Sequence, residues 1–458
     1  MSRSARRDRA AIASVLAAMA LVVLDAGIVA IALPSMAGAL GETPARAMMI
    51  VSAYQAALLI GLLPCAHIAD RFGCRRLFVG GITLFAISAV LCALAPTLPL
   101  LVAARILQGL GGAAIMSLGI AVLRFALGPD RLGSAIAWNA LVVAICSAVA
   151  PLAGAVALMF ADWRSLFLIA LPAALPALVA APALPSVNPS RTSVDLPGIS
   201  LYAAAAALLV AAGQSASASA FWAIALAVAA LSCGWRLFAR ERGRRAPIVP
   251  VDLLALGPFR TSGLASVFFF TAQSAGLLAL PFYLQLSLGR SAAAAGVVLA
   301  CWPLAVAATS RVADRLANRF AYGRICAGGG TVLAAGLAAA ALWPIHGSIA
   351  PLALCAIVCG IGFGLFQVPN NRSMFLAAPA DRSAAAGALQ ATARLAGQTA
   401  GALLVSFLLA AAPPAIAPRL AIGVAAVAAL LAGWISWPRA PVAADRASAA
   451  QPCSYSAR

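Results

Sequence analysis

Residues 11–33 read AIASVLAAMALVVLDAGIVAIAL, a run of 23 residues in which Asp25 carries the only charged side chain. A helix needs about 20 predominantly apolar residues to cross the hydrocarbon core of a bilayer. The run is also longer than the ~7–15 apolar residues at the centre of a cleavable signal peptide. We therefore predict that it forms an uncleaved first transmembrane helix, preceded by the basic residues Arg3, Arg6, Arg7 and Arg9.

Similar apolar runs follow along the whole chain. Of its 458 residues, 64% are hydrophobic and only 9% are charged, a balance that a water-soluble domain cannot hide in its core. We predict an all-α polytopic membrane protein with about 14 transmembrane helices, each of roughly the length that a bilayer requires. Their expected positions are residues 11–33, 47–66, 77–95, 98–122, 133–159, 164–184, 199–214, 219–238, 261–284, 291–310, 322–343, 349–369, 384–411 and 417–437.

The arginines predict the orientation of these spans. All 31 basic residues are arginine, and with the N-terminus in the cytoplasm 25 of them fall in cytoplasmic segments. Cytoplasmic loops of membrane proteins are enriched in basic residues. We therefore predict a multi-pass protein of the cell inner membrane with both termini in the cytoplasm. The only arginines in external segments are then Arg46, Arg164, Arg290 and Arg419.

The same distribution bears on the partners of the chain. A nucleic-acid-binding protein would gather its basic residues on one soluble face, so the net charge of +19 does not indicate a nucleic-acid partner. The basic loop 239–260 would lie against anionic lipid headgroups. The more general explanation is that this loop only fixes the orientation of the neighbouring helices.

A short repeat indicates two related halves. The sequence Ala-Asp-Arg occurs at 69–71 and again at 313–315, eight predicted spans further on. Duplicated halves are typical of secondary transporters, which rock one half against the other. We predict a cytoplasmic segment 1–10, an N-terminal six-helix bundle 11–184, a linker 185–260 with an extra helix pair and the basic loop, a C-terminal six-helix bundle 261–437, and a cytoplasmic tail 438–458. The two six-helix bundles are expected to be pseudo-symmetric.

Three charged residues lie well inside predicted spans, where charge is expensive: Asp25, Arg105 and Arg394. The first two are candidates for a function. Asp25 is the one carboxylate well inside a span, and we interpret it as a proton- or substrate-binding group. The alternative is a structural partner for Arg105. Arg105, followed by Gln108, either faces a wet cavity and acts on an acid, or extends toward the lipid headgroups.

Charged residues also follow the second and tenth spans. A compact charged segment at the membrane surface can latch one conformation of a transporter. The alternative is a solvated loop, but the repeat favours a gate. The predicted gating residues are Asp70, Arg71, Gly73, Arg75 and Arg76, with Asp314 and Arg315 in the second half.

Other polar or helix-breaking residues are weaker candidates. Pro151 and Gly154 interrupt the fifth span and permit a kink or a close helix crossing. Several polar and aromatic side chains inside spans are possible cavity residues, although packing or interfacial anchoring is the commoner role of such residues. These cavity candidates are Tyr54, Gln55, Trp138, Asn139, Gln273 and Tyr283.

Signals for enzymes and metal sites are absent from the sequence. It contains no HExxH, GxSxG or phosphate-binding GxxxxGK[ST] motif. Its ten cysteines form no CxxC pair. We therefore expect no enzymatic activity, no metal and no cofactor, so that the energy for any transport must come from an ion gradient or from the substrate itself.

Four segments resemble motifs of the major facilitator superfamily, in particular its fourteen-span drug:proton antiporters. Residues 24–34 are similar to LDxTVVNVALP, and residues 66–76 are similar to GxLaDrxGrk. Residues 101–113 resemble LxxxRxxQGxgaa, and residues 150–155 resemble the antiporter motif GPxxGG. The chain departs from these motifs at Gly27, Ala30, Ala66, Cys74, Ala150 and Ala155.

The resemblance implies a secondary transporter that works by alternating access. It places Asp25 on the motif acid and Arg105 on an arginine associated with proton coupling. We expect a monomer that exports small hydrophobic or cationic compounds in exchange for protons. The alternatives are a metabolite uniporter or symporter of the same fold, and a receptor or scaffold that does not transport.

Overall fold

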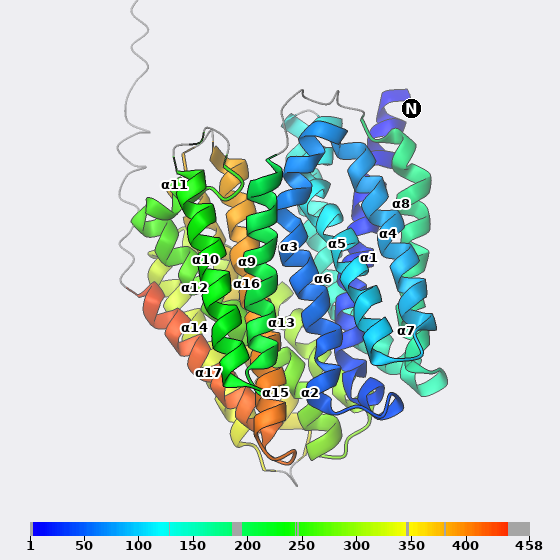
Figure 1. The fold of residues 1–458 in the computed structure, drawn as a ribbon, viewed down its shortest axis with the longest axis vertical. Coiled ribbons are helices and arrows are strands. Elements are labelled where there is room, and N and C mark those ends of the chain that lie inside the picture. Colours follow the sequence, from blue (N-terminus) through cyan, green and yellow to red (C-terminus); the bar gives the residue numbers. More distant parts are fainter. Residues whose placement is uncertain are drawn as a thin grey trace, which may run out of the picture.

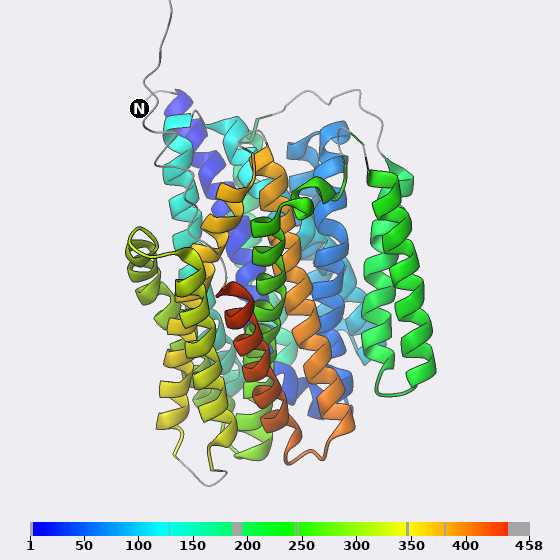
Figure 2. The ribbon, with the colours of Figure 1, turned by 90° about the vertical axis from the view of Figure 1, so that its left-hand side faces the viewer.

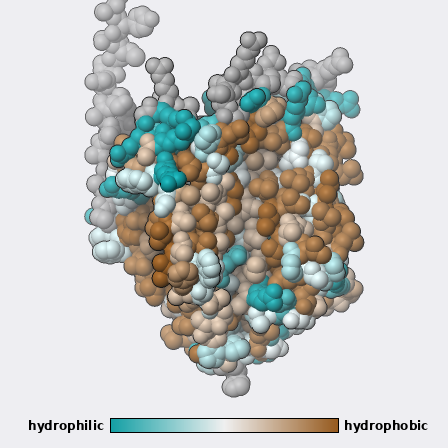
Figure 3. All heavy atoms as spheres, viewed as in Figure 1, coloured by the Kyte–Doolittle hydropathy of each residue, from teal (hydrophilic) through white to brown (hydrophobic). Residues whose placement is uncertain are grey.

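The computed structural model describes residues 3–127, 129–185, 195–242, 244, 247–344, 348–379 and 382–437. Within these ranges the secondary structure is helical, and 14 helices are long and apolar enough to cross a membrane. Figure 3 shows one face of the molecule that is hydrophobic over its middle part, with hydrophilic residues toward both ends, most of them at the upper end. The predicted fold class, an all-α polytopic membrane protein with about 14 spans, is confirmed. The predicted tail 438–458 lies outside the described residues.

The long helices alternate in direction between two ends of the bundle (Figure 1). We call the end where the chain begins, with Gly73 and Ala317, the N-side, and the end with Gly41 and Ala95 the opposite side. In chain order the helices are α1 (Arg3–Ala39), α2 (Pro44–Ala47), α3 (Met49–Phe72), α4 (Cys74–Leu94), α5 (Leu98–Ala126), α6 (Pro129–Phe160), α7 (Leu166–Ile169), α8 (Ala174–Ala180), α9 (Leu196–Ser215), α10 (Ala220–Glu241), α11 (Val251–Ala255), α12 (Gly257–Phe282), α13 (Ala292–Ala317), α14 (Tyr322–Leu342), α15 (Ala350–Ala377), α16 (Ser383–Ala411) and α17 (Ala417–Ser436).

The sixth span is broken into short pieces, which the sequence did not reveal. It consists of α7 and α8 with 3₁₀ turns at Trp163–Ser165, Leu171–Ala173 and Ala181–Ala183. Proline lacks a backbone donor and clashes with the preceding turn. Pro172 and Pro182 lie in two of the 3₁₀ turns and Pro176 lies in α8, so three closely spaced prolines interrupt the hydrogen bonds of this span.

The same helix pairings occur in the first and last six spans. In the first half α4 packs on α5, and in the second α14 packs on α15. Glycines permit both crossings, because a Cβ on Gly111 would lie 2.8 Å from Gly81 O and one on Gly329 would lie 2.8 Å from Gly362 O. Close crossings at small residues are typical of membrane helices. We call the helices α1–α8 the N-half and α12–α17 the C-half.

The extra helix pair, α9 and α10, stands at one side of the bundle (Figure 2), where it contacts both halves. Helix α9 contacts α3 of the N-half and α16 of the C-half. The Tyr202 hydroxyl on α9 donates to the carbonyl of Leu59 on α3 at 2.9 Å. The pair therefore packs against the α3–α16 seam and is not a detached linker.

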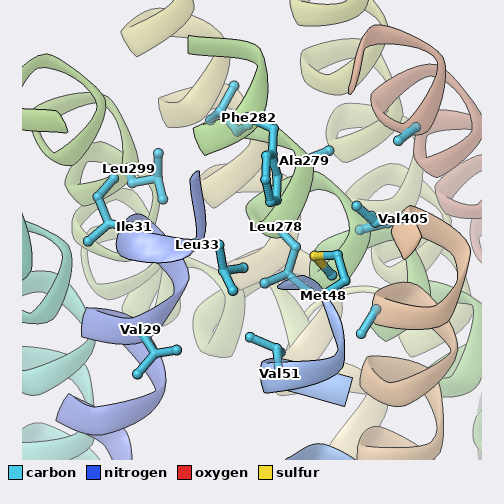
Figure 4. Close-up of a cluster of buried hydrophobic side chains, with 14 of the residues drawn as sticks. Val29, Ile31, Leu33, Met48, Val51, Leu278, Ala279, Phe282, Leu299 and Val405 are labelled. Carbon is cyan, nitrogen blue, oxygen red and sulfur yellow. The ribbon is translucent and has the colours of Figure 1, made fainter. Parts of the chain in front are cut away.

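An apolar cluster joins the halves on the opposite side (Figure 4). We call it the opposite-side seal. Two hydrogen bonds strengthen the contact, from Gln285 Nε2 to Ile31 O at 3.0 Å and from Ser406 Oγ to Ala45 O at 3.1 Å. Toward the N-side the cores of the two halves are largely separate clusters. The structure is thus closed on the opposite side, where the seal contains Val29, Ile31, Leu33, Met48, Val51, Leu278, Phe282, Leu299 and Val405.

Candidate functional site

Asp25, Arg105 and Gln108 form a closed polar network inside the N-half. Arg105 Nη1 donates to Asp25 Oδ2 at 2.6 Å and to Gln108 Oε1 at 2.6 Å. Gln108 Nε2 donates to the other carboxylate oxygen, Asp25 Oδ1, at 2.9 Å. All three side chains are buried, with Asp25 and Arg105 only 1% exposed. The sequence singled out these three residues, and the structure brings them together.

Further contacts tie the network to the surrounding helices. Arg105 Nε donates to the carbonyl of Ile50 on α3 at 3.2 Å. The guanidinium of Arg105 lies 4.1 Å from the centre of the Tyr54 ring, close enough for a cation–π interaction. The thiol of Cys92 on α4 lies 3.6 Å from Gln108 Oε1. The alternative that Arg105 extends to lipid headgroups is therefore wrong, because its charge is held inside the half.

The local sequence explains this arrangement. Residues three apart lie on the same face of a helix, so α5 presents Arg105 and Gln108 together. Gly109 lets α3 approach that face, since a Cβ there would lie 2.5 Å from Tyr54 O. Asp25 is supplied by α1, whose neighbouring residues in the span are apolar.

The network has two chemical properties that matter for function. It is a buried ion pair, and removing one partner of such a pair typically costs ~3–5 kcal/mol because a charge is left uncompensated. It is also next to the opposite-side seal. Ile50, whose carbonyl binds Arg105, lies between the seal residues Met48 and Val51, and Asp25 is four residues before Val29. A change in the charge of Asp25 therefore acts directly beside the contact between the halves.

The predicted antiporter-type residues lie where α6 crosses two other helices. A Cβ on Gly154 would lie 3.2 Å from Ile28 O on α1. On the other face, a Cβ on Gly296 of α13 would lie 2.9 Å from Pro151 O and 2.5 Å from Ala155 Cβ. The α6–α13 contact crosses from one half to the other. The sequence analysis did not predict a role for Gly296. The one feature that could have marked this residue is that it is a glycine inside an apolar span.

The predicted gating residues lie on the N-side, one group in each half. Gly73 joins α3 to α4 with a positive φ of 92°, which favours glycine. Arg71 and Arg76 are exposed and Arg75 is half-buried, whereas the side chain of Asp70 lies outside the described part of the chain. Asp70 and Arg71 are not in a loop, because they lie in the last turn of α3.

The second gating group is also helical. Asp314 and Arg315 lie in the last turns of α13, and both are exposed. Asp314 Oδ1 lies 3.8 Å from Arg372 Nη1 of α15, so this acid pairs inside the C-half. In both halves the helix therefore continues past its apolar span into the charged segment.

The weaker cavity candidates have different surroundings. Trp138 is exposed and borders an N-side cavity of about 520 Å³ between α1 and α6, together with Leu16 and Ser134. Tyr283 is fully buried and donates to Trp343 O at 2.9 Å, so it is a packing residue. Each of three others has a buried side-chain oxygen with no hydrogen-bond partner in the described structure: Gln55, Asn139 and Gln273.

Comparisons with known proteins agree with this fold. Residues 15–402 match the family described as Major Facilitator Superfamily. The chain is 38% identical over 408 residues to the uncharacterized transporter YebQ of Escherichia coli, covering 87% of this chain and 88% of that protein. It is 26% identical to the riboflavin transporter RibZ of Clostridioides difficile, covering 81% of each. It is 29% identical to the multidrug efflux pump LfrA of Mycolicibacterium smegmatis, covering 87% of this chain and 80% of that pump.

A solved structure shares the arrangement of helices. A crystal structure of the peptide transporter POT, a mutant in complex with alafosfalin, superposes with a TM-score of 0.72. It covers 95% of this chain and 98% of that chain at 18% sequence identity. At that identity the likeness concerns the fold alone.

Proposed function

The chain belongs to the major facilitator superfamily and is a transporter, not an enzyme, and on that premise we propose that it exports small hydrophobic or cationic compounds in exchange for protons. The observation that carries the proposal is the buried Asp25–Arg105–Gln108 network beside the opposite-side seal. A buried carboxylate inside one half, placed beside the contact with the other half, provides a means of coupling protons to alternating access.

The proposed cycle assigns the N-side to the cytoplasm, following the distribution of arginines. In the state described here the seal is closed and Asp25 pairs with Arg105, as a deprotonated acid would. Substrate binding from the cytoplasm favours the state open on the opposite side. There Asp25 takes up a proton, its pairing with Arg105 weakens, and the protein returns with the proton. Each ligand shifts the equilibrium only by its difference in affinity for the two states.

The substrate class rests on the charge of this site and on the relatives. A carboxylate that alternates between a proton and an ion pair can also attract a cationic substrate. LfrA is named a multidrug efflux pump, which favours a broad range of apolar compounds. A second candidate is transport of a metabolite, which the relation to RibZ, named a riboflavin transporter, favours; a uniporter of this kind would move its substrate with no proton flux.

We propose the remaining features on the same grounds. The protein is a monomer in the cell inner membrane with both termini in the cytoplasm. Its basic N-side residues, including Arg240 and Arg242, lie near anionic headgroups. The proton gradient is the energy source, and no cofactor takes part.

The proposal is tested in inverted membrane vesicles loaded with a pH gradient. Addition of a transported lipophilic cation releases protons from native vesicles, and we expect Asp25→Asn to abolish this release. The matched control is Asp162→Asn, which neutralises an exposed acid on the opposite side that pairs with Arg164 and accepts from Trp163 N, and it retains the response. Substrate movement without proton release in native vesicles contradicts antiport and favours the metabolite uniporter.

A further inference from the structure

Thr399 on α16 differs from the other threonines inside the described helices. The others each donate their hydroxyl to the carbonyl four residues earlier: Thr83, Thr261, Thr271, Thr309, Thr331 and Thr392. Thr399 is only 3% exposed, yet its Oγ1 has no hydrogen-bond partner within the described structure. A buried polar group without a partner costs ~1–3 kcal/mol. Because the carbonyl of Leu395 is within reach in the same helix, the free hydroxyl requires an explanation.

Gln55 on α3 has a similar unsatisfied oxygen. Its side chain is half-buried, and Oε1 is buried with no hydrogen-bond partner in the described structure. Ser52, three residues earlier and therefore on the same helical face, accepts a hydrogen bond from Gln214 Nε2 of α9 at 3.3 Å. The face of α3 that carries Gln55 is thus polar and is directed toward the seam with α9 and α16.

The packing places Gln55 and Thr399 at the same depth on the two sides of this seam. Leu395, one turn before Thr399, packs into the apolar core of the N-half. Val51 of α3 and Val405 of α16 both belong to the opposite-side seal (Figure 4). Since a helix rises about 1.5 Å per residue, Gln55 lies ~6 Å and Thr399 ~9 Å from the seal along antiparallel helices.

This layer is also the layer of the proton-coupling network. Tyr54, which stacks on Arg105, directly precedes Gln55. The Gln55 oxygen belongs to the N-half and the Thr399 oxygen to the C-half. Helix α9 of the extra pair contacts both helices that carry them, α3 and α16. A few precisely oriented polar groups in an apolar surround are typical of small-molecule sites.

We propose that Gln55 and Thr399 form a recognition pair for a hydrogen-bond donor, an N–H or O–H group, of the transported compound. This inference rests on the proposed function and names the substrate feature that the site selects. Gln55 Oε1 can only accept a hydrogen bond, and the Thr399 hydroxyl can accept as well as donate, so a donor group of the ligand can satisfy either oxygen. A compound that lacks donors leaves them unpaired and is bound more weakly. Because one residue of the pair belongs to each half, the affinity for the donor group also depends on the relative position of the two halves.

The test uses two rhodamine ethyl esters that are both lipophilic monocations. In one dye each of the two amino groups on the xanthene ring is secondary and carries an N–H, and in the other both amino groups are dialkylated and carry none. Affinity for the purified native protein is measured by fluorescence anisotropy in detergent, which needs no proton gradient. We expect the native protein to prefer the N–H dye by about tenfold, the effect of one hydrogen bond to an otherwise unpaired group.

Matched variants assign the preference to the pair. Thr399→Val, which keeps the shape of the side chain, and Gln55→Leu should abolish the preference, whereas Thr399→Ser should retain it. The control Thr331→Val removes a hydroxyl that already bonds to its own helix, to Ala327 O, and should leave the preference intact.

Three results would overturn the inference: no preference in the native protein, a preference that survives Thr399→Val, or a preference that Thr331→Val abolishes equally. Loss of proton release in vesicles with the dye preference intact would refute the proposed antiport and leave the recognition pair standing. The reverse outcome, antiport without a preference that depends on Thr399, would refute only the recognition pair.

Discussion

At the scale of single residues, Arg105 makes a set of contacts that no other type of side chain could make at the same time. It binds Asp25, Gln108 and the Ile50 carbonyl while its flat face rests on Tyr54. A lysine provides one charge without the planar fork and without stacking. The sequence could predict that Asp25 and Arg105 matter, because a charge inside an apolar span is expensive.

We expect Arg105→Ala to lower the free energy of unfolding by ~3–5 kcal/mol, because it leaves Asp25 as an unpaired buried charge. Arg105→Lys should be intermediate. The double variant Asp25→Asn with Arg105→Gln should recover much of the loss, since neither charge remains. Thermal unfolding of the purified variants measures this coupling.

The control for this series is Arg164→Ala, whose guanidinium is exposed and pairs with Asp162 on the surface. Surface pairs contribute only ~0–1 kcal/mol, so its effect should be small. Strictly additive losses in the double variant of Asp25 and Arg105 would show that the two residues do not act as a pair.

Other residues of the site could not be predicted from the sequence. The Ile50 carbonyl is a backbone group, and nothing in an apolar run marks one carbonyl as a ligand for Arg105. Thr399 looks like any helical threonine until its hydrogen bonds are compared with those of the others. Tyr283 has the sequence features of a cavity residue, but its surroundings make it a packing residue. In each case the property depends on contacts between distant segments.

At the scale of helices, the crossing of α6 with α13 is the closest contact between the halves at a glycine. Pro151 lies in the antiporter-type segment, and its partner Gly296 comes from the other half, whereas Gly154 packs against Ile28 of α1 in the same half. The closed seal depends on this approach, because a larger residue at Gly296 pushes α13 away from α6. The sequence predicted a close crossing at Gly154, but it could not name the helix that uses it.

We therefore expect Gly296→Ala to shift the protein toward the state open on the opposite side. Spin labels at the opposite-side ends of the two helices, on cysteines at Phe160 and Ala292 in a background without native cysteines, should report a longer distance. Gly328→Ala is the control, because a Cβ there meets nothing within 4 Å, and it should leave the distance unchanged. An unchanged distance in Gly296→Ala contradicts a role of this crossing in closing the seal.

The extra helix pair has its own ionic contact on the N-side. Asp195, just before α9, forms ion pairs with Arg240 and Arg244 at the end of α10. The hydrogen bond from Arg240 lowers the pKa of Asp195, although burial opposes this effect. A lowered pKa means that the stabilising contribution is present above the unfolded-state pKa of ~3.9 and is lost as the pH falls through the lower folded-state value.

We expect Asp195→Asn to unfold at a lower temperature than the native protein at pH 6. The difference should be small, since partly exposed pairs contribute ~0.2–1 kcal/mol. It should shrink as the pH falls below about 4 and disappear only below the lowered folded-state pKa of Asp195, where the native carboxylate is also neutral. Melting curves of both proteins between these pH values measure it, and a difference that persists in acid would exclude the ion pairs as its cause.

At the scale of the whole molecule, the architecture could largely be predicted from the sequence. Fourteen spans follow from hydropathy alone, since each must supply about 20 apolar residues. The repeated Ala-Asp-Arg indicated two halves. The seal and the placement of α9 on the α3–α16 seam could not be predicted. Both join segments that lie far apart in the sequence, and the helices concerned are apolar on all faces. Hydrophobic periodicity carries little information where a helix is apolar all round.

The orientation of the whole molecule gives a further prediction. In a background without native cysteines, a membrane-impermeant thiol reagent should label Arg46→Cys in intact cells. It should label Arg76→Cys, an exposed position on the N-side, only after permeabilisation. The expectation follows from the arginine distribution, which places the N-side in the cytoplasm. The reverse pattern would invert the proposed direction of transport.

The central claim is that Asp25 couples proton movement to the rocking of the two halves, and substrate counterflow tests it most directly. Native protein and Asp25→Asn are reconstituted at equal amounts, and two activities are measured with one lipophilic cation: exchange across the bilayer without a gradient, and accumulation driven by a pH gradient. We predict that Asp25→Asn retains exchange but loses proton-driven accumulation, because translocation continues while the proton has no site. Accumulation at the native level in Asp25→Asn would contradict the account.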